Sequence, residues 1–174
     1  MPVDPQSLSL KIYPSPTLME CAQEVDPMDP NVQAVGQRMI EMMFESSGVG
    51  LAAPQVGLSW RLFVTRDPNS EEDEKNGCVW INPRLEVICD ELVVDEEGCL
   101  SLPEIRADIR RPSGIRISGF DCNGKPQEMS SNEFIARIWQ HENDHLDGIL
   151  ILDKMTAMGR LVNRKMIRNL ERSQ

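Results

Sequence analysis

The sequence predicts an α+β fold, with antiparallel strands around a central helix and a further helix at the C-terminal end. Two observations support this prediction. Apolar residues recur at helical spacing in three stretches, 31–46, 130–148 and 155–172. Between the first two stretches lie several short β-branched segments, separated by Pro, Asn or acidic residues, which are typical of strands.

The first predicted helix spans 31–46 and is amphipathic. Asp29 and Pro30 supply a start signal, and Gly48 supplies a stop signal. The helical spacing involves Val32, Val35, Met39, Met42 and Met43. We interpret these side chains as core residues rather than as a ligand-binding surface.

The middle of the chain is predicted to form the strands. The expected strands are 61–66, 78–83, 84–96 and 113–121. An acidic, polar loop at 68–77 separates the first two, and "DCNG" at 121–124 is a turn signal.

The second predicted helix, 130–148, contains both histidines of the chain. Ser131 or Asn132 can cap it, Glu133 lies in its first turn, and Gly148 can end it. A short strand, "ILIL" at 149–152, and a last helix from about 155 to 172 follow.

Composition indicates a globular protein without a membrane span. The chain has 174 residues, of which 40% are hydrophobic and 26% charged, so we expect one domain, 1–174. No run of 18 apolar residues is present, and the N-terminus resembles neither a signal nor a transit peptide. We therefore expect a cytoplasmic protein with no membrane partner.

Charge is distributed unevenly along the chain. The net charge of −10 argues against a general nucleic-acid binder. From residue 153 to 174, however, six basic and two acidic residues give +4, and the remainder of the chain carries −14. This tail is either a docking element or a solvated helix face.

The stretch "QHENDHLDG", 140–148, carries the clearest chemical signal. His141 and His145 are four residues apart, so a helix places them on one face, where both can bind one metal ion. Glu142 lies between them, beside the metal position. This H-E-x-x-H arrangement is typical of metal hydrolases, whereas the alternative is an ordinary amphipathic helix with polar residues facing water.

A catalytic metal needs a third protein ligand, and no further histidine is available. Cys99 lies in "EEGCLSLPE", 96–104, where a strand ends, and a thiolate is a strong ligand. On its own, Cys99 would be interpreted as a buried structural thiol, and only the missing third ligand favours a metal-binding role. The odd number of cysteines, five, argues against a disulfide framework.

A third segment, "GVGLAAPQVG" at 48–57, is rich in glycine and contains Gln55. Glycines permit close backbone approach, and the Gln55 amide can donate to an oxygen. Without the other two segments, a simple turn after the first helix would explain this one.

Together the three blocks "GVGLAAPQ" (48–55), "EGCLS" (97–101) and "QHENDHLDG" (140–148) resemble the peptide deformylase family. The order and spacing of the blocks agree with the family pattern, and the resemblance extends over nearly the whole chain. It implies a metal-dependent hydrolase that removes the formyl group from formyl-methionyl nascent polypeptides and releases formate. The second helix would then be a central metal-binding helix.

The resemblance also implies roles for individual residues. Cys99, His141 and His145 would bind the metal, and Glu142 would be the general acid and base. Gln55 and the backbone N–H of Leu100 would bind the formyl oxygen, and Gly50 would let the reacting group approach. The substrate peptide would pair with the backbone near Val49 and Gly98. An apolar pocket for the methionine side chain would include Val49, Phe134 and Ile138, with Arg137 and Arg106 near its edges.

The identity of the metal stays open at this stage. Two imidazoles and one thiolate suit zinc by chemistry alone. The family resemblance instead implies one Fe²⁺ per chain, with Zn²⁺, Ni²⁺ or Co²⁺ in isolated protein. It also implies that the basic C-terminal helix contacts the ribosome.

Three other functions remain open on the sequence. A zincin-type metalloprotease would share the helix motif but would leave Cys99 and Gln55 without a role. A cysteine hydrolase would use Cys99 as nucleophile with one histidine as base. A binding module would use the metal for stability alone.

Overall fold

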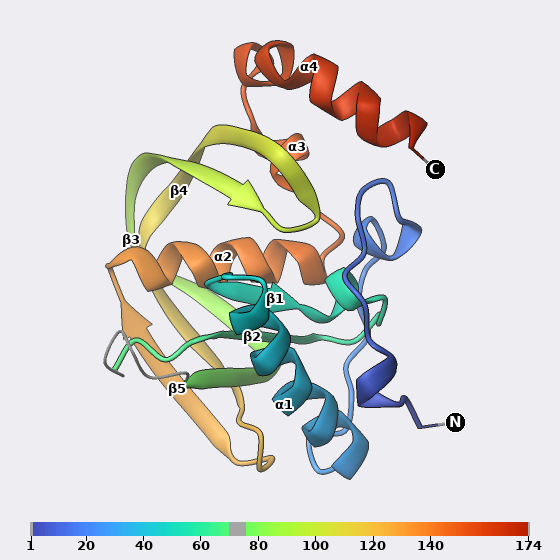
Figure 1. Cartoon of the computed structure of the whole chain (residues 1–174). Helices are drawn as coiled ribbons and strands as arrows, with labels where there is room; N and C mark the ends of the chain where they lie inside the picture. Colours follow the sequence, from blue (N-terminus) through green and yellow to red (C-terminus); the bar gives the residue numbers. More distant parts are fainter. Residues whose placement is uncertain (1, 70–75, 174) are drawn as a thin grey trace.

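The computed structural model describes residues 2–69 and 76–173, and in this part of the chain five strands form one antiparallel sheet. The strands are β1 (Gly50–Ala52), β2 (Leu62–Arg66), β3 (Gly77–Cys99), β4 (Leu102–Phe120) and β5 (Pro126–Ser131), in that order across the sheet. The helices are α1 (Pro30–Glu45), α2 (Phe134–Leu146), α3 (Ile151–Lys154) and α4 (Ala157–Arg172), and short 3-10 helices are η1 (Pro5–Ser7), η2 (Pro16–Leu18) and η3 (Ala53–Val56) (Figure 1).

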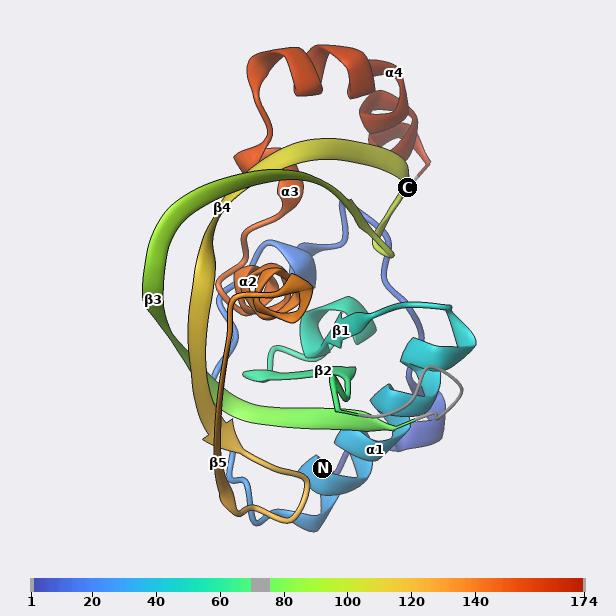
Figure 2. The ribbon, with the colours of Figure 1, turned by 90° about the vertical axis from the view of Figure 1, so that its left-hand side faces the viewer.

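The sheet bends around α2. Strands β3 and β4 pair along nearly their whole length, and the register shifts four times, between Ile81 and Cys99 of β3. Such irregularities bend and twist a strand pair. Figure 2 shows the result: β3 and β4 arch around α2, which is seen end-on. The prediction of antiparallel strands around a central helix is confirmed.

Three apolar clusters hold these layers together. One packs α1 against β1, β2 and the start of β3. A second packs α2 against the sheet and includes the edge-to-face pair of Trp80 and Trp139, whose ring centroids are 6.1 Å apart. A third packs the first half of β4 against α3 and α4. Helix α2 is thus fixed between the sheet and the arch.

The helix predictions hold with small shifts. Asp29 caps α1 through its side chain, which accepts from the Asn31 N–H. At α2 the N-cap is Glu133, two residues after Ser131 and one after Asn132, the two predicted caps, and Ser131 Oγ accepts from the Glu133 N–H. Gly148 has a φ of +70° just past the end of α2, as expected for a terminating glycine.

The predicted strand 149–152 is wrong, because Ile151–Lys154 is the short helix α3. Its apolar residues, Leu150, Ile151 and Leu152, are buried. Four consecutive apolar residues show no periodicity, so the same run is compatible with a buried helix and with a buried strand.

The strand pattern was incomplete in four places, one of which is the short strand β1, which no pattern predicted. The predicted strands 78–83 and 84–96 form one strand, β3. The first half of β4 was missed because its inward positions include Ala107 and Arg111, which do not read as an apolar alternation. Strand β5 was missed because it has no fully buried residue. Of the predicted loop 68–77, residues 70–75 lie outside the described residues.

In the described residues, no helix is long and apolar enough to cross a membrane.

Replacing Gly148 by alanine should destabilise the protein. A Cβ there would lie 2.8 Å from the backbone oxygen of Met19, and the positive φ is unfavourable for alanine. We expect a loss of about 1–3 kcal/mol in the free energy of unfolding, measured by urea denaturation.

Gly159→Ala is the matched control. Gly159 lies inside α4, where a Cβ would be 3.4 Å from the nearest atom, Thr156 Oγ1. Alanine there should stabilise the helix by about 0.5–1 kcal/mol. Equal effects of the two substitutions would contradict this account of the α2 terminus.

Candidate functional site

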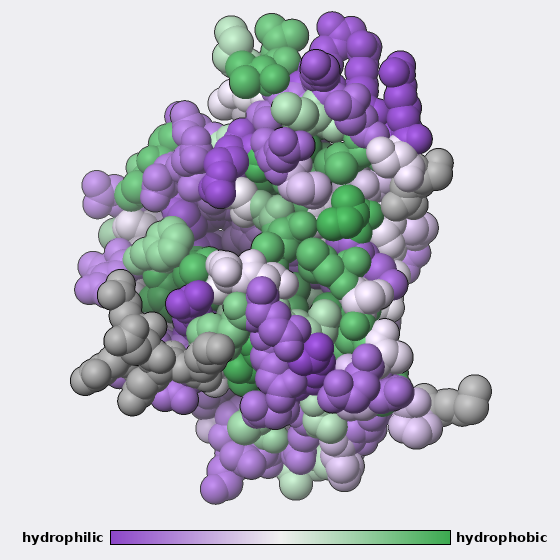
Figure 3. Space-filling view, in the orientation of Figure 1, coloured by the Kyte–Doolittle hydropathy of each residue, from purple (hydrophilic) through white to green (hydrophobic). Residues whose placement is uncertain are grey.

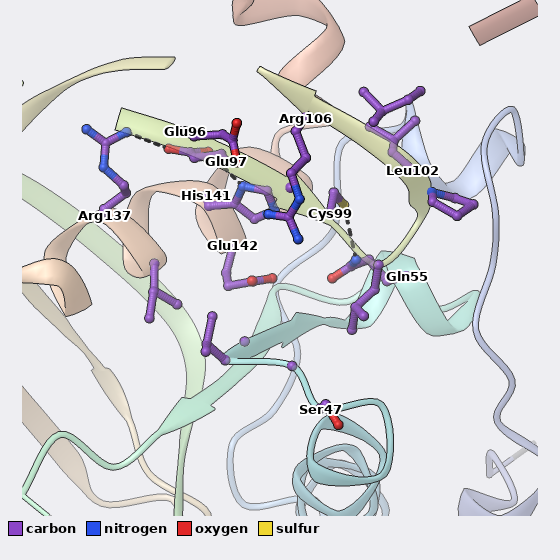
Figure 4. A pocket seen from close by; sticks show the side chains of 18 of the residues that line it. Ser47, Gln55, Glu96, Glu97, Cys99, Leu102, Arg106, Arg137, His141 and Glu142 are labelled. Carbon is purple, nitrogen blue, oxygen red and sulfur yellow. Dashed lines mark hydrogen bonds and ion pairs between the residues drawn. The ribbon is translucent and has the colours of Figure 1, made fainter. Parts of the chain in front are cut away.

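Helix α2 and the end of β3 bring three predicted metal ligands together. The donor atoms of Cys99, His141 and His145 all lie within 4.8 Å of one another. Cys99 Sγ is 3.3 Å from His145 Nε2, and the two imidazole rings have centroids 5.0 Å apart. Because the histidines are one helical turn apart, α2 presents both to the strand end that carries Cys99. Figure 4 shows two of the three residues, Cys99 and His141.

A buried carboxylate orients His141. Glu97 Oε2 lies 2.9 Å from His141 Nδ1, which leaves Nε2 of the same ring free to face the cluster. Glu97 also accepts from Arg111 Nη2 at 2.9 Å and from Arg137 Nη1 at 2.8 Å. Burial alone would raise the pKa of Glu97, but the hydrogen bonds from His141 and Arg111 outweigh it and hold that pKa well below its usual value.

The ion-pair network around Glu97 extends to a further residue of α2, Asp144. Arg111 Nη1 donates to Asp144 Oδ2 at 2.8 Å, and Asp144 is the residue before His145. Lys154 of α3 lies 3.4 Å from the same carboxylate oxygen. The charged network therefore fixes β3, β4, α2 and α3 relative to one another.

Arg137 does not stand free at the pocket edge. It is buried, and besides Glu97 it donates to the carbonyl oxygens of Ile109 and Val93 at 3.0 and 2.8 Å. It therefore fixes the arch over α2 rather than offering a free cation to a ligand.

The histidines differ in their electrostatic environment. Burial and the charge of His141 hold the pKa of His145 well below its usual value, which favours the neutral imidazole that binds metals. Burial would likewise lower the pKa of His141, but hydrogen bonds to Cys99 and Glu97 raise it. A raised pKa favours the protonated imidazole, so metal binding to His141 would have to displace a proton from the ring.

The donor set fits a divalent transition metal. Two imidazoles and a thiol are the ligand types that such ions bind in hydrolase sites. In addition, His145 Nδ1 and Glu142 Oε2 are buried and have no hydrogen-bond partner among the described residues.

Glu142 points into the same site from α2. Only 4% of it is exposed, and burial raises the pKa of Glu142 to about 7. Gly50 faces this carboxylate so closely that a Cβ on Gly50 would be 2.5 Å from Glu142 Oε1. Glycine at position 50 therefore makes room for the carboxylate.

Gln55 is held by both ends of its side-chain amide. Its Oε1 accepts from the Ala52 N–H at 2.9 Å, which orients Nε2 toward Cys99 Sγ at 3.5 Å and Ser101 Oγ at 3.2 Å. The short helix η3 positions Gln55, which is 2% exposed. An amide donor thus lies beside the candidate metal ligands.

These residues line a cavity of about 520 Å³. The lining includes the predicted residues Gly50, Gln55, Cys99, Leu100, His141 and Glu142 together with Val49, Gly98, Phe134 and Ile138. Val49 and Phe134 are exposed, whereas Ile138 is buried. Figure 3 shows the hollow beneath the β3–β4 arch, with hydrophobic residues gathered beside it. His145 is 1% exposed and is not among the residues that line the cavity.

The arginine predicted near the pocket mouth, Arg106, lines the cavity. A Cβ on Gly98 would be 3.0 Å from Arg106 Nη1, so the guanidinium lies over the Gly98 backbone. Figure 4 shows its side chain descending from β4 toward the site.

Sequence reasoning gave no role to Glu97, Arg111 or Ser101. One signal was available for Glu97. It lies two residues before Cys99 on a predicted strand, and residues two apart share a face. Nothing in the sequence connected Arg111 or Ser101 with α2 or Gln55, because those contacts span 33 and 46 residues.

Comparison with known proteins gives consistent results. A family model described as polypeptide deformylase matches residues 8–161. The chain is 40% identical over 165 residues to the peptide deformylase of Thermotoga maritima, covering 94% of this chain and 96% of that protein. It is 39% identical over 149 residues to peptide deformylase 1B, chloroplastic/mitochondrial, of Arabidopsis thaliana.

The plant match covers 86% of this chain and 54% of that protein, so the chain spans about half the length of that relative. A solved structure of Arabidopsis thaliana peptide deformylase 1B superimposes with a TM-score of 0.88 at 36% identity, covering 95% of this chain and 91% of that one. The family match covers most of the chain, and the structural superposition covers 95% of it. The chain therefore belongs to the polypeptide deformylase family.

Proposed function

We propose that this protein is a metal-dependent hydrolase that removes the formyl group from formyl-methionyl nascent polypeptides and releases formate. The observation that carries the proposal is the position of Gln55. Its amide nitrogen lies 3.5 Å from Cys99 Sγ, in one cavity with Glu142 and His141. A zincin-type protease needs the histidines and the glutamate, but it has no use for this thiol and amide.

Cys99, His141 and His145 would hold one divalent metal, and we propose Fe²⁺ as the physiological ion. When bound, the ion supplies a Lewis acid that activates water and polarises a carbonyl group. Zn²⁺, Ni²⁺ or Co²⁺ would occupy the same ligands in isolated protein.

Glu142, Gln55 and the Leu100 N–H would carry out the proton transfers and the charge stabilisation. Glu142 accepts a proton from the attacking water as the new bond to the formyl carbon forms. Negative charge develops on the formyl oxygen, and Gln55 Nε2 and the Leu100 N–H donate to it. Glu142 then donates the proton to the leaving amine as the C–N bond breaks. Formate and a peptide with a free N-terminus result.

The cavity suits an extended formyl-methionyl chain. Val49, Phe134 and Ile138 would surround the methionine side chain, and the backbone near Val49 and Gly98, which line the cavity, would pair with the peptide. Backbone hydrogen bonds do not depend on side-chain identity, so the site would accept peptides with many different residues after the formyl-methionine. Arg106 lies over Gly98 at the mouth of the cavity, where the peptide would leave the site.

We further propose that residues 1–174 act as one domain in the cytoplasm, and that α4 contacts the ribosome. Arg160, Arg164, Lys165 and Arg168 of α4 are exposed, which supports a contact with an anionic surface.

Purified protein should release formate from formyl-Met-Ala-Ser, and prior chelation should abolish the release. We would purify it anaerobically, measure formate, and determine by elemental analysis which metal is present and whether there is one per chain. N-acetyl-Met-Ala-Ser and an internally quenched N-blocked peptide are the controls. Internal cleavage without formate release from metal-loaded protein would refute the proposal in favour of a protease.

Gly50→Ala should lower the turnover number by at least about tenfold, because the new methyl group would displace the Glu142 carboxylate from its position. Metal content should stay unchanged, because none of the three ligands is touched. Gly159→Ala is the control, since Gly159 lies in α4 outside the residues that line the cavity. Full turnover by Gly50→Ala would show that the close approach of Gly50 is not needed.

Replacing Arg164, Lys165 and Arg168 by glutamate should weaken ribosome binding and leave turnover of a short formyl peptide within twofold. These side chains are exposed, whereas Asn163 and Ile167 anchor α4 and stay in place. Co-sedimentation with ribosomes at two salt concentrations measures the effect, because phosphate contacts weaken with salt. Unchanged sedimentation would rule out this face of α4 as the contact.

A further inference from the structure

We infer that the N-terminal segment Lys11–Tyr13 positions the two groups that bind the formyl oxygen, through backbone hydrogen bonds to both turns that carry them. The inference rests on the proposed function. It adds positioning groups from a segment outside all three sequence blocks that predict the site.

The segment is bonded to each turn by one amide. The Lys11 N–H donates to the Gln55 carbonyl oxygen at 2.7 Å. Two residues later, the Tyr13 N–H donates to the Ser101 carbonyl oxygen at 2.9 Å. Gln55 and Leu100 are the proposed donors to the formyl oxygen, and Ser101 directly follows Leu100.

A third hydrogen bond closes a ring. Gln55 Nε2 donates to Ser101 Oγ at 3.2 Å, so η3, the Leu100–Ser101 turn and the N-terminal segment are joined pairwise. Gln55 and Ser101 are 2% and 0% exposed, so water cannot replace a lost partner at either carbonyl. The ring therefore depends on the N-terminal amides.

Side chains of the segment add two anchors. The Lys11 stem lies over Gly57, where a Cβ would be 2.7 Å from Lys11 Cε, and Gly57 ends η3 with a φ of +85°. Tyr13 packs beside the cluster of β4, α3 and α4, and its hydroxyl donates to Glu171 Oε1 at 3.3 Å. Figures 1 and 2 show the blue N-terminal chain running alongside this part of the molecule.

Positioning matters for this step because an oxyanion donor works only in a fixed place. Removal of one such donor typically lowers turnover by about 10²–10³-fold. Removing a backbone hydrogen bond that holds such a donor in place should lower turnover by part of that factor. This removal should lower kcat more than it raises KM, because the charge on the formyl oxygen develops only in the transition state.

The test replaces single backbone amides by esters, which removes an N–H and leaves every side chain in place. Cys21 is exposed and lies eight residues after Tyr13, so a synthetic peptide of residues 1–20 can be joined to a chain that starts at Cys21. Esters are placed at Lys11, at Tyr13 and, as the control, at Ile12, whose N–H has no hydrogen-bond partner among the described residues. The ligated all-amide protein is the reference.

We expect the Lys11 ester to lower kcat for formyl-Met-Ala-Ser about tenfold, part of the factor for a whole donor, with KM within twofold. The Tyr13 ester should act similarly, and the Ile12 ester should stay within twofold. Metal content and the thermal unfolding midpoint are measured for each protein, so that a general loss of structure is recognised.

The deciding measurement is a double-mutant cycle with Gln55→Ala. Gln55→Ala alone should lower kcat about 100-fold or more. In that background the Lys11 ester should have no further effect, because it acts through Gln55. The same tenfold loss in both backgrounds, or no loss in either, would overturn the inference. Full activity of Gln55→Ala, or no formate release by the reference protein, would overturn the proposed function as well.

Discussion

The geometry of the site depends on one buried carboxylate, that of Glu97. It binds two arginines and one histidine, which come from β4 and α2, and it is itself 6% exposed. A buried ion that loses one partner typically costs about 3–5 kcal/mol, a large part of the stability of an ordinary domain. The four groups are therefore fixed together, and the orientation of the His141 ring follows from them.

The same network explains why the long arch of β3 and β4 closes over α2 in one position. Apolar packing alone would allow β3 to slide over α2, because Val87, Ile88, Leu92, Val93 and Val94 of β3 are all exposed and this part of the strand has few buried residues. Arg137 and Arg111 supply directional bonds where apolar contacts are sparse. Arg137 reaches the Val93 carbonyl oxygen on the arch, and Arg111 reaches Asp144 on the helix. Charge pairing thus sets the register that brings Cys99 to the histidines.

The opposite wall of the site is fixed by backbone groups rather than by charges. Ala52 orients the Gln55 amide, and the segment around Lys11 holds its carbonyl. Glu142 lies between the two walls, and only a glycine at position 50 leaves it room. A buried carboxylate with an unpartnered oxygen is costly, which is typical of groups kept for chemistry rather than for stability.

The sequence by itself determined the fold class, the helix that bears the histidines and the membership of Cys99 and Gln55 in one site. Helical spacing and three short motifs act over a few residues, so they can be read locally. Only the tertiary structure decided the continuous length of β3 and β4, the helical form of 151–154, and the roles of Glu97, Arg111 and the Lys11 amide. These features depend on contacts between residues 14 to 46 positions apart and on inward positions filled by Ala107 and Arg111. No local pattern encodes such contacts, because their free energy arises when distant segments are buried together.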